Sequence, residues 1–244
     1  MHVIITGMNG TVAPAIANFY QQENDFVIPY DRTKISTENE LEIEKFLLEE
    51  KTDILIHCAM GSPIWTKILA KICFKHHIKF VYISTVSVFS NENKGPHTID
   101  KLPDATDDYG KYKIESESIA LKENPKTYIT RLGWQIGYGR YSNQMIEFLY
   151  HKMETEGVIK ASSLWYPSTS FLNDTAKAVY DIVKTFQPGI FHVNSNDIYT
   201  FYDIVKQLSK TYKDFIVVET KDFSADHRMV DQRVNIEKLS KIFK

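Results

Sequence analysis

Residues 3–13 read VIITGMNGTVA, an apolar run that ends at Thr6 and leads into the pattern T-G-x-x-G-x-x-A. In that pattern Gly7 permits a tight turn, Gly10 lets backbone approach a pyrophosphate, and the small Ala13 lets a helix lie close to the strand. The free N–H groups at the start of such a helix favour an anion. An ordinary glycine turn is the structural alternative, but the flanking strand and helix favour a dinucleotide-binding turn. The residues expected to contact the phosphates are Gly7, Met8, Asn9, Gly10, Thr11 and Val12.

A residue that binds the ribose of such a cofactor is expected about 20 residues further along. Asp31 lies there, at the end of the second apolar run, and Arg32 follows it. Asp31 suits the ribose hydroxyls of NAD, whereas Arg32 would neutralise the 2′-phosphate of NADP. A solvated Asp-Arg pair in a turn is the structural alternative. The sequence leaves NADP and NAD both open, with NADPH preferred.

Short apolar strands alternate with helical stretches over the first half of the chain. The strands are expected at Val3–Ile5, Phe26–Ile28, Asp53–Cys58, Lys79–Ser84 and Thr127–Leu132. The helices are expected at Thr11–Glu23, Glu38–Glu50, Trp65–His77 and Tyr109–Lys122, the last capped by Thr106 or Asp107. This alternation predicts an α/β protein with a doubly wound, mostly parallel sheet of the Rossmann type, covered by helices on both faces.

After residue 139 the pattern loosens. Helices are expected at Asn143–Glu156, Asp174–Phe186, Thr200–Tyr212 and Ile236–Phe243, and strands at Val158–Lys160, Ile190–Asn194 and Phe215–Glu219. We therefore divide the chain into a dinucleotide-binding core, residues 1–139, and a smaller substrate-facing lobe, residues 140–244, which is interleaved with the core.

Composition excludes several classes of function. The 244 residues carry a net charge of −2, and their Lys and Arg residues form no basic stripe, so neither nucleic acid nor a membrane surface is an expected partner. No apolar run approaches the ~20 residues of a membrane-spanning helix, and the first strand begins too early to leave room for a signal peptide. The two cysteines, Cys58 and Cys73, make no disulfide framework, and the eight histidines show no metal-ligand spacing. We expect a cytoplasmic protein without a metal.

A candidate acid–base pair follows the polar stretch from Ser90 to Asp108. Tyr109 and Lys113 form a Y-x-x-x-K, whose side chains share one face of a helix. A free tyrosine titrates near ~10, and a nearby ammonium together with a positive nicotinamide ring would lower that pKa. An isolated Y-x-x-x-K is more often a surface pair. Here Ser84 and Thr85 bring hydroxyls to the C-terminal end of a strand, the edge where ligands of doubly wound sheets bind.

Further stretches carry a family resemblance. They are ITGMNG at 5–10, VYISTVSVF at 81–89, DDYGKYKIESE at 107–117, ITRLGWQIG at 129–137, SFLNDTAKAV at 170–179 and GIFHVNS at 189–195. In this order and spacing they resemble the extended-type short-chain dehydrogenase/reductases, most closely the dTDP-4-dehydrorhamnose reductase branch. The resemblance covers most of the chain. Two departures concern the substrate: Val86-Ser87 stands where the branch has Asp-Tyr, and the segment between Ala59 and Phe80 is shorter than in typical members.

The resemblance implies a role for each matching residue. Thr85 would orient the substrate carbonyl, Tyr109 would donate the proton, and Lys113 would bind the nicotinamide ribose and tune Tyr109. Trp134 falls at the tryptophan that lines the sugar pocket. We place Ser87 beside Thr85 and Trp134 in this pocket, and expect Ser162–Phe171 to close it. The loop that passes the cofactor would be Ala59, Met60 and Gly61.

The expected function is reduction of a keto group, on a nucleotide-linked sugar or a similar carbonyl substrate, by an NAD(P)-dependent oxidoreductase that forms a homodimer. An epimerase or dehydratase of the same family is an alternative, because the same Tyr-Lys pair serves that chemistry. A cofactor-binding regulatory subunit without catalysis is a second alternative. The intact set of Thr85, Tyr109 and Lys113 favours an enzyme.

Overall fold

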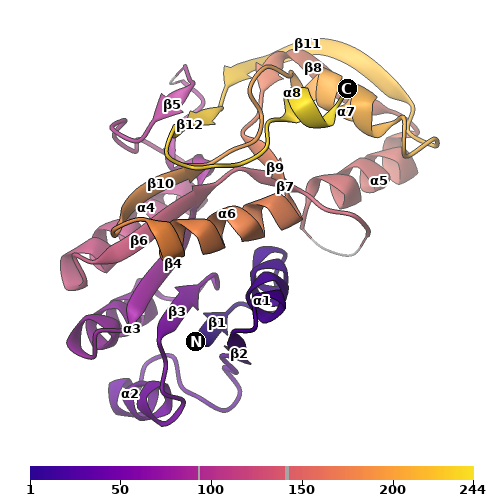
Figure 1. Cartoon of the computed structure of the whole chain (residues 1–244). Helices are drawn as coiled ribbons and strands as arrows, with labels where there is room; N and C mark the ends of the chain where they lie inside the picture. The colour runs from indigo at the N-terminus through magenta and orange to yellow at the C-terminus, as the bar shows by residue number, and fades with distance from the viewer. Residues whose placement is uncertain (93, 141–142) are drawn as a thin grey trace.

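A six-stranded parallel sheet forms the centre of the computed structural model, which describes residues 1–92, 94–140 and 143–244. The strand order is β10-β6-β4-β3-β1-β2, and every neighbouring pair is parallel (Figure 1). The strands are β1 (His2–Thr6), β2 (Phe26–Pro29), β3 (Ile54–His57), β4 (Lys79–Thr85), β6 (Thr127–Leu132) and β10 (Gly189–Val193). The predicted doubly wound α/β fold is confirmed.

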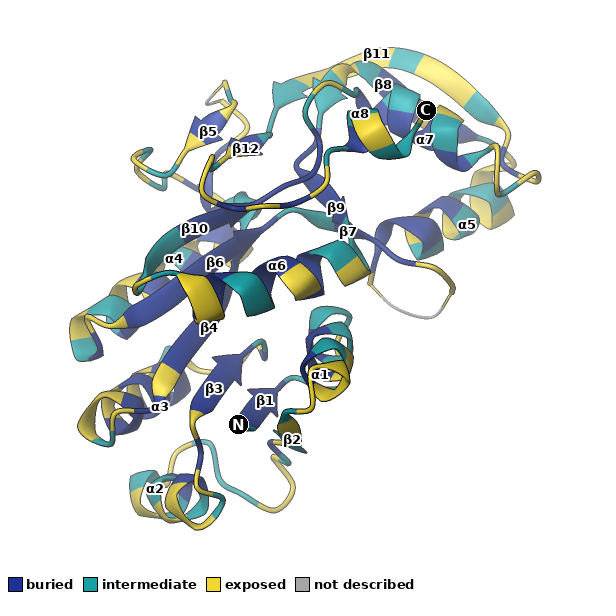
Figure 2. Ribbon diagram, in the orientation of Figure 1, coloured by how far each residue is buried: buried dark blue, intermediate teal, exposed yellow. Residues whose placement is uncertain are grey.

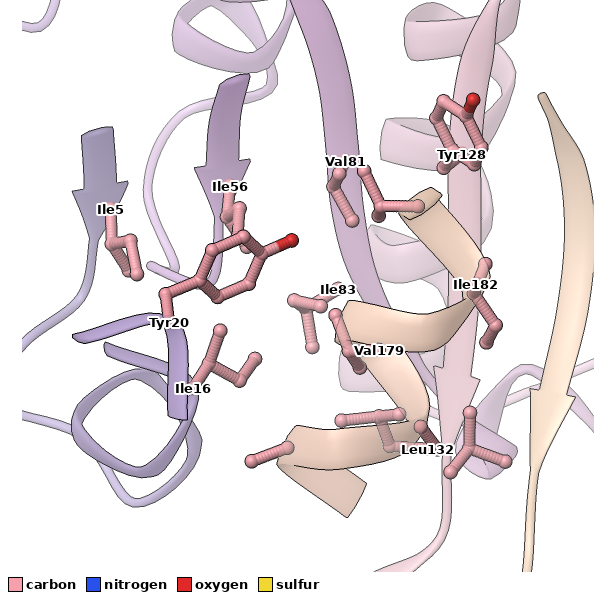
Figure 3. Packing of buried hydrophobic residues seen from close by; sticks show 14 of the residues in the cluster. Ile5, Ile16, Tyr20, Ile56, Val81, Ile83, Tyr128, Leu132, Val179 and Ile182 are labelled. Atoms are coloured by element: carbon pink, nitrogen blue, oxygen red, sulfur yellow. The ribbon is translucent and has the colours of Figure 1, made fainter. Parts of the chain in front are cut away.

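Helices cover both faces of this sheet. One face carries α1 (Val12–Gln22) and α6 (Leu172–Thr185), and the other carries α2 (Glu40–Glu49), α3 (Pro63–Lys75) and α4 (Asp108–Glu123). Successive side chains of a strand point to opposite faces, so Val3 and Ile5 pack under α1 while Ile4 packs on the other side. Figure 3 shows the α1/α6 side of this core, and Figure 2 shows how deeply the strands are buried. Burial on both faces explains why the inner strands β1, β3 and β4 read as nearly continuous apolar runs, whereas the edge strand β2 is only partly buried.

The remaining elements are three short strand pairs and their helices, beyond the C-terminal edge of the sheet. The strand pairs are β7 (Trp134–Ile136) with β9 (Thr169–Phe171), β8 (Ile159–Tyr166) with β11 (Val217–Asp226), and β5 (His97–Thr98) with β12 (Met229–Val230). The helices are the 3₁₀-helix η1 (Val86–Val88), α5 (Met145–Glu156), α7 (Phe201–Leu208) and α8 (Leu239–Ile242). Elements α5, β8 and α7 enclose an apolar cluster of their own.

Some boundaries differ from the sequence-based expectation. The strands expected at Val158–Lys160 and Phe215–Glu219 are the first parts of the longer β8 and β11. The added part of β11 is polar and mostly exposed, so no apolar alternation marks it. The helix expected at Ile236–Phe243 is only α8, because Ile236 packs against the α1/α6 face of the sheet. Strands β5, β7, β9 and β12 have two or three residues each, too few to show a period.

Helix α4 begins at a closely packed turn. Asp107 caps it by accepting a hydrogen bond from the Gly110 backbone N at 2.9 Å, as the sequence predicted for this position. A Cβ on Gly110 would lie 2.3 Å from the Ser87 carbonyl oxygen and 2.3 Å from the Ala105 Cβ. The first turn of α4 therefore lies directly against η1, and only glycine permits this approach.

We expect Gly110→Ala to destabilise the protein by ~1–3 kcal/mol, the usual cost of inserting a methyl group into a closely packed site. Gly189→Ala is the matched control, since a Cβ there would meet nothing within 4 Å. Urea unfolding of both variants measures the difference. Equal stabilities would show that α4 and η1 separate easily.

Candidate active site

A cavity of about 850 Å³ lies at the C-terminal edge of the sheet, where β1, β3, β4 and β6 end. This volume falls within the usual range for ligand sites. Most of the residues that the sequence singled out line it. They are Gly7, Asn9, Gly10, Thr11, Val12, Arg32, Ala59, Met60, Thr85, Ser87, Tyr109, Lys113 and Trp134. Elements far apart in the sequence thus bring one set of polar groups together around a single space.

Three of the expected cofactor residues do not line this cavity. The Met8 side chain packs against the α1/α6 face of the sheet. The Asp31 carboxylate accepts hydrogen bonds from the backbone N and the hydroxyl of Thr33, at 2.9 and 2.7 Å. Gly61 turns toward the Trp65 ring, which lies only 2.9 Å from where a Cβ would be. Each of the three therefore has a local partner within the protein.

Further lining residues escaped the sequence reasoning. They are Ala13, Cys58, Ile83, Val86, Leu132, Gly133, Gln135 and Asn143, whereas Ser84, which the sequence placed at this edge, also lines the cavity. Cys58 and Leu132 lie at or next to the ends of strands, so the rule that ligands bind at this edge could have identified them. Asn143 has no such signal, because it reaches the cavity by a contact far along the chain. Its carbonyl oxygen accepts a hydrogen bond from the Thr11 hydroxyl at 3.1 Å.

The glycine turn after β1 is held tightly against the end of β3. Gly7 has a φ of +81°, in the region that favours glycine, and a Cβ there would lie 2.9 Å from the Ala59 backbone N. The Thr6 hydroxyl oxygen accepts hydrogen bonds from the backbone N–H groups of Cys58 and Ala59, at 3.1 and 3.0 Å. Gly10 donates its N–H to the Gly7 carbonyl at 2.8 Å. These bonds fix the position of the turn relative to β3.

His57 is a structural histidine beneath this turn. The Thr6 hydroxyl, which already accepts two hydrogen bonds, donates its proton to His57 Nδ1 at 2.8 Å. The ring proton is therefore on Nε2, which donates to the Thr66 hydroxyl at 3.2 Å. Burial, reinforced by the charge of Lys113, lowers the pKa of His57 to about 3. A neutral ring with both nitrogens bonded is not a catalytic base.

Cys58 lines the cavity but is not a nucleophile. Burial raises the pKa of its thiol to about 12, although the Lys113 ammonium acts in the opposite direction. A thiol with this pKa stays protonated at neutral pH, and the thiolate is the reactive form.

Helix α4 presents three side chains to the end of β4, at Tyr109, Lys113 and Glu117, one turn apart on one face. Lys113 Nζ donates to the Ile83 carbonyl oxygen at 2.9 Å and lies 4.9 Å from the centre of the Tyr82 ring. Glu117 Oε1 accepts the Ser84 hydroxyl at 2.5 Å. Lys113 and Glu117, one helical turn apart on α4, thus bond to Ile83 and Ser84, which are neighbours on β4.

In the protein alone, Lys113 is not among the groups that change the pKa of Tyr109, so the lowering expected from Lys113 together with a bound nicotinamide ring stays a prediction. Burial raises the pKa of Tyr109, and hydrogen bonding to Thr85 opposes this only in part. Lys113 directs its ammonium to the Ile83 carbonyl, and burial lowers the pKa of Lys113 to about 8. Tyr109 is therefore a neutral phenol at physiological pH, which is the form that donates a proton.

Two hydroxyls lie beside Tyr109 on the cavity wall. The Thr85 Oγ1 accepts the backbone N–H of Ser87 at 3.1 Å and donates to the Ser87 hydroxyl at 3.3 Å. Tyr109 itself is 40% exposed. Thr85, Ser87 and Tyr109 therefore present their hydroxyls to the same cavity.

Trp134 presents part of its ring to the cavity and packs the rest against other aromatic rings. The ring centroids of Phe148 and Trp165 lie 5.2 and 6.3 Å from that of Trp134. The expectation that Ser162–Phe171 closes the pocket is wrong, because none of these residues lines the cavity. Trp165 lies behind Trp134, and its indole N–H donates to His227 Nδ1 at 3.0 Å.

Two absences hold for the described residues, which omit 93, 141 and 142. They contain no group of three or more His, Cys, Asp or Glu side chains placed to hold a metal ion. Among them, too, every helix is too short or too polar to cross a membrane.

Comparisons with known proteins agree with this geometry. A family model described as the RmlD substrate binding domain matches residues 64–227. The dTDP-4-dehydrorhamnose reductase of Aggregatibacter actinomycetemcomitans is 19% identical over 224 residues, which span 82% of this chain and 76% of the relative.

Two solved structures show the same fold. A dTDP-4-dehydrorhamnose reductase from Clostridium acetobutylicum has a TM-score of 0.84 and 25% identity, over 100% of this chain and 96% of the other. The same enzyme from Bacillus anthracis, in complex with NADP, has a TM-score of 0.82 and 19% identity, over 99% and 96% of the two chains. Because the family model matches more than half of its residues and the fold agrees along its whole length, this chain belongs to the RmlD substrate binding domain family.

Proposed function

We propose that this protein is an NADPH-dependent reductase of a keto group on a nucleotide-linked sugar, such as dTDP-4-dehydrorhamnose. The observation that carries the proposal is the meeting of Thr85, Tyr109 and Lys113 on one wall of a cavity whose opposite side is a glycine turn. The substrate class follows the relatives, which are named as reductases of dTDP-linked keto sugars.

The residues of the glycine turn fit a dinucleotide. Gly10 lines the cavity, and a Cβ there would lie 3.2 Å from the Gly7 carbonyl oxygen, so this turn is close enough to favour glycine. The N-terminus of α1 follows directly and directs its free N–H groups toward this space. Gly7, Asn9, Gly10 and Thr11 would hold the pyrophosphate. The bound cofactor supplies a hydride for the carbonyl carbon of the substrate.

The surroundings of Asp31 and Arg32 favour NADPH over NADH. Asp31 is bonded to Thr33 in an Asx turn and does not line the cavity. Arg32 lines the cavity, next to the Met60 carbonyl at 3.4 Å and 6.0 Å from the centre of the Trp65 ring. A guanidinium in this position would pair with a 2′-phosphate.

The side chains on the opposite wall would move the proton. Tyr109 Oη donates its proton to the carbonyl oxygen, and the oxygen becomes the hydroxyl of the product. The Thr85 hydroxyl donates a hydrogen bond to the same oxygen and orients the carbonyl. Lys113 binds the nicotinamide ribose and stabilises the phenolate left on Tyr109 until solvent returns the proton.

The wider assignments belong to the same proposal. Residues 1–139 would bind the dinucleotide and residues 140–244 the substrate, with Trp134 packing against the sugar ring. The net charge of −2 and the scattered Lys and Arg residues support a small-molecule substrate rather than nucleic acid or a membrane. A homodimer in the cytoplasm completes the proposal, and light scattering of the purified protein tests the dimer.

Arg32→Ala is expected to weaken NADPH binding by about 10- to 100-fold, because a charge-assisted hydrogen bond contributes ~1.5–3 kcal/mol. NADH binding stays within about 2-fold of the unmodified protein, since NADH has no 2′-phosphate. Calorimetric titration with both cofactors measures the two affinities. Lys34→Ala, which removes an exposed charge two residues away, is the control for net charge. Equal losses for NADPH and NADH would contradict the assignment of Arg32.

Tyr109→Phe is expected to lower kcat by ~10²–10⁴-fold, the usual contribution of a general acid, while the Kd for NADPH changes little. The assay is oxidation of NADPH with dTDP-4-dehydrorhamnose. Tyr138→Phe, which removes an exposed hydroxyl, is the matched control. Full activity in Tyr109→Phe would exclude the mechanism. A protein that binds NADPH but reduces no keto sugar would instead support a regulatory subunit.

A further inference from the structure

A buried ion pair lies behind the catalytic face of α4. Arg131, on β6, donates from Nη2 to Glu117 Oε2 at 2.7 Å and from Nε to Glu117 Oε1 at 3.0 Å. The exposed fractions of the two side chains are 2% and 5%. Arg131 also contacts His192 Nε2 at 3.3 Å, and its guanidinium lies 5.3 Å from the centre of the Phe89 ring. Every oxygen of the carboxylate therefore has a fixed partner.

Such a pair is not explained by stability alone. Removing two charges from water costs several kcal/mol per ion, and apolar residues of similar volume often serve as well. What the pair does provide is a fixed geometry. It connects α4 to β6, and through the Ser84 hydroxyl it also connects α4 to β4.

The ion pair fixes Glu117 next to Lys113 on the same face of α4. Glu117 lies one helical turn from Lys113 and faces the same strand. Its partner Ser84 lies between Ile83, whose carbonyl accepts the Lys113 ammonium, and Thr85. The orientation of α4 in which Glu117 bonds to Ser84 and Arg131 is thus the same orientation in which Lys113 bonds to the Ile83 carbonyl oxygen.

We propose that Glu117, held by Arg131 and Ser84, is a positioning residue that keeps the charged ammonium of Lys113 at the cavity wall. The proposal deepens the proposed function, since Lys113 is the group assigned to the nicotinamide ribose. Glu117 touches neither cofactor nor substrate in this assignment; it acts through Lys113.

The electrostatics support the same role. Burial lowers the pKa of Lys113 to about 8, while the negative charge of Glu117 opposes that shift. The other titratable or charged groups that face the pair are His57 and Cys58 from β3 and its end, Tyr82 from β4, Tyr109 and Tyr112 from α4, Arg131 from β6 and His192 from β10. Since a nearby anion favours the ammonium form, removal of the Glu117 charge lowers the pKa of Lys113 further.

Glu117→Gln tests this directly. We expect the titration midpoint of Lys113, followed by NMR of protein labelled with ¹³C at lysine Cε and assigned with Lys113→Met, to fall by about 0.5–1 pH unit. The ammonium form of Lys113 disappears as the pH rises through this midpoint. Glu117→Gln should therefore lose NADPH affinity at a lower pH than the unmodified protein does. Glu115→Gln, the same charge change on the exposed side of α4, should leave the midpoint unchanged.

An unchanged Lys113 midpoint in folded Glu117→Gln, accompanied only by a lower melting temperature, overturns the proposal. If Glu117→Gln does not fold, Arg131→Lys is the second test. This variant keeps a buried cation but removes the paired hydrogen bonds from the guanidinium that hold the Glu117 carboxylate. A shifted midpoint in this variant supports positioning, and an unshifted one overturns it. The NMR titration needs no cofactor. Failure of the unmodified protein to bind NADPH would therefore refute the proposed function and leave this test standing.

Discussion

The contact between α4 and the C-terminal end of β4 determines the geometry of the whole cavity. The strand contributes carbonyls and hydroxyls, and the helix contributes Tyr109, Lys113 and Glu117 at one-turn intervals. Because β4 is buried in the centre of the sheet, the strand cannot shift to follow the helix. The helix must instead adopt the one position in which its polar side chains meet the strand, since a buried ammonium or carboxylate without a partner is costly.

Buried hydrogen bonds also hold the glycine turn after β1, which forms the other wall of the cavity. Thr6 uses its hydroxyl three times, toward two backbone N–H groups at the end of β3 and toward His57. This places the glycine turn at a constant distance from the loop at Ala59. Each wall is thus attached to its own strand by buried polar bonds, and the strands are joined by the sheet. Because these bonds lie within the protein itself, they hold both walls in place, and such order reduces the ordering cost of binding.

The parts of this site that depend on local spacing could be predicted from the sequence. Gly7 and Gly10 follow from their separation in a strand–turn–helix, and Tyr109 and Lys113 share a helix face, so the chain alone indicates them. Asn143 reaches the cavity only through the tertiary fold, which no local pattern records. The segment Ser162–Phe171 has the aromatic and hydroxyl content of a pocket wall, yet it forms β8 and β9 and pairs with other strands. Composition alone does not distinguish these two uses.

The position of β10 at the edge of the sheet has a consequence for how the protein is made. Residues Gly189–Val193 supply the sixth strand, and Val179 and Ile182 of α6 cover the same apolar face as α1. When only the first five strands of this sheet have left the ribosome, the face that carries α1 still lacks α6. The nascent chain must keep that face from aggregating for at least another 50 residues of synthesis, a few seconds at ~5–20 residues per second.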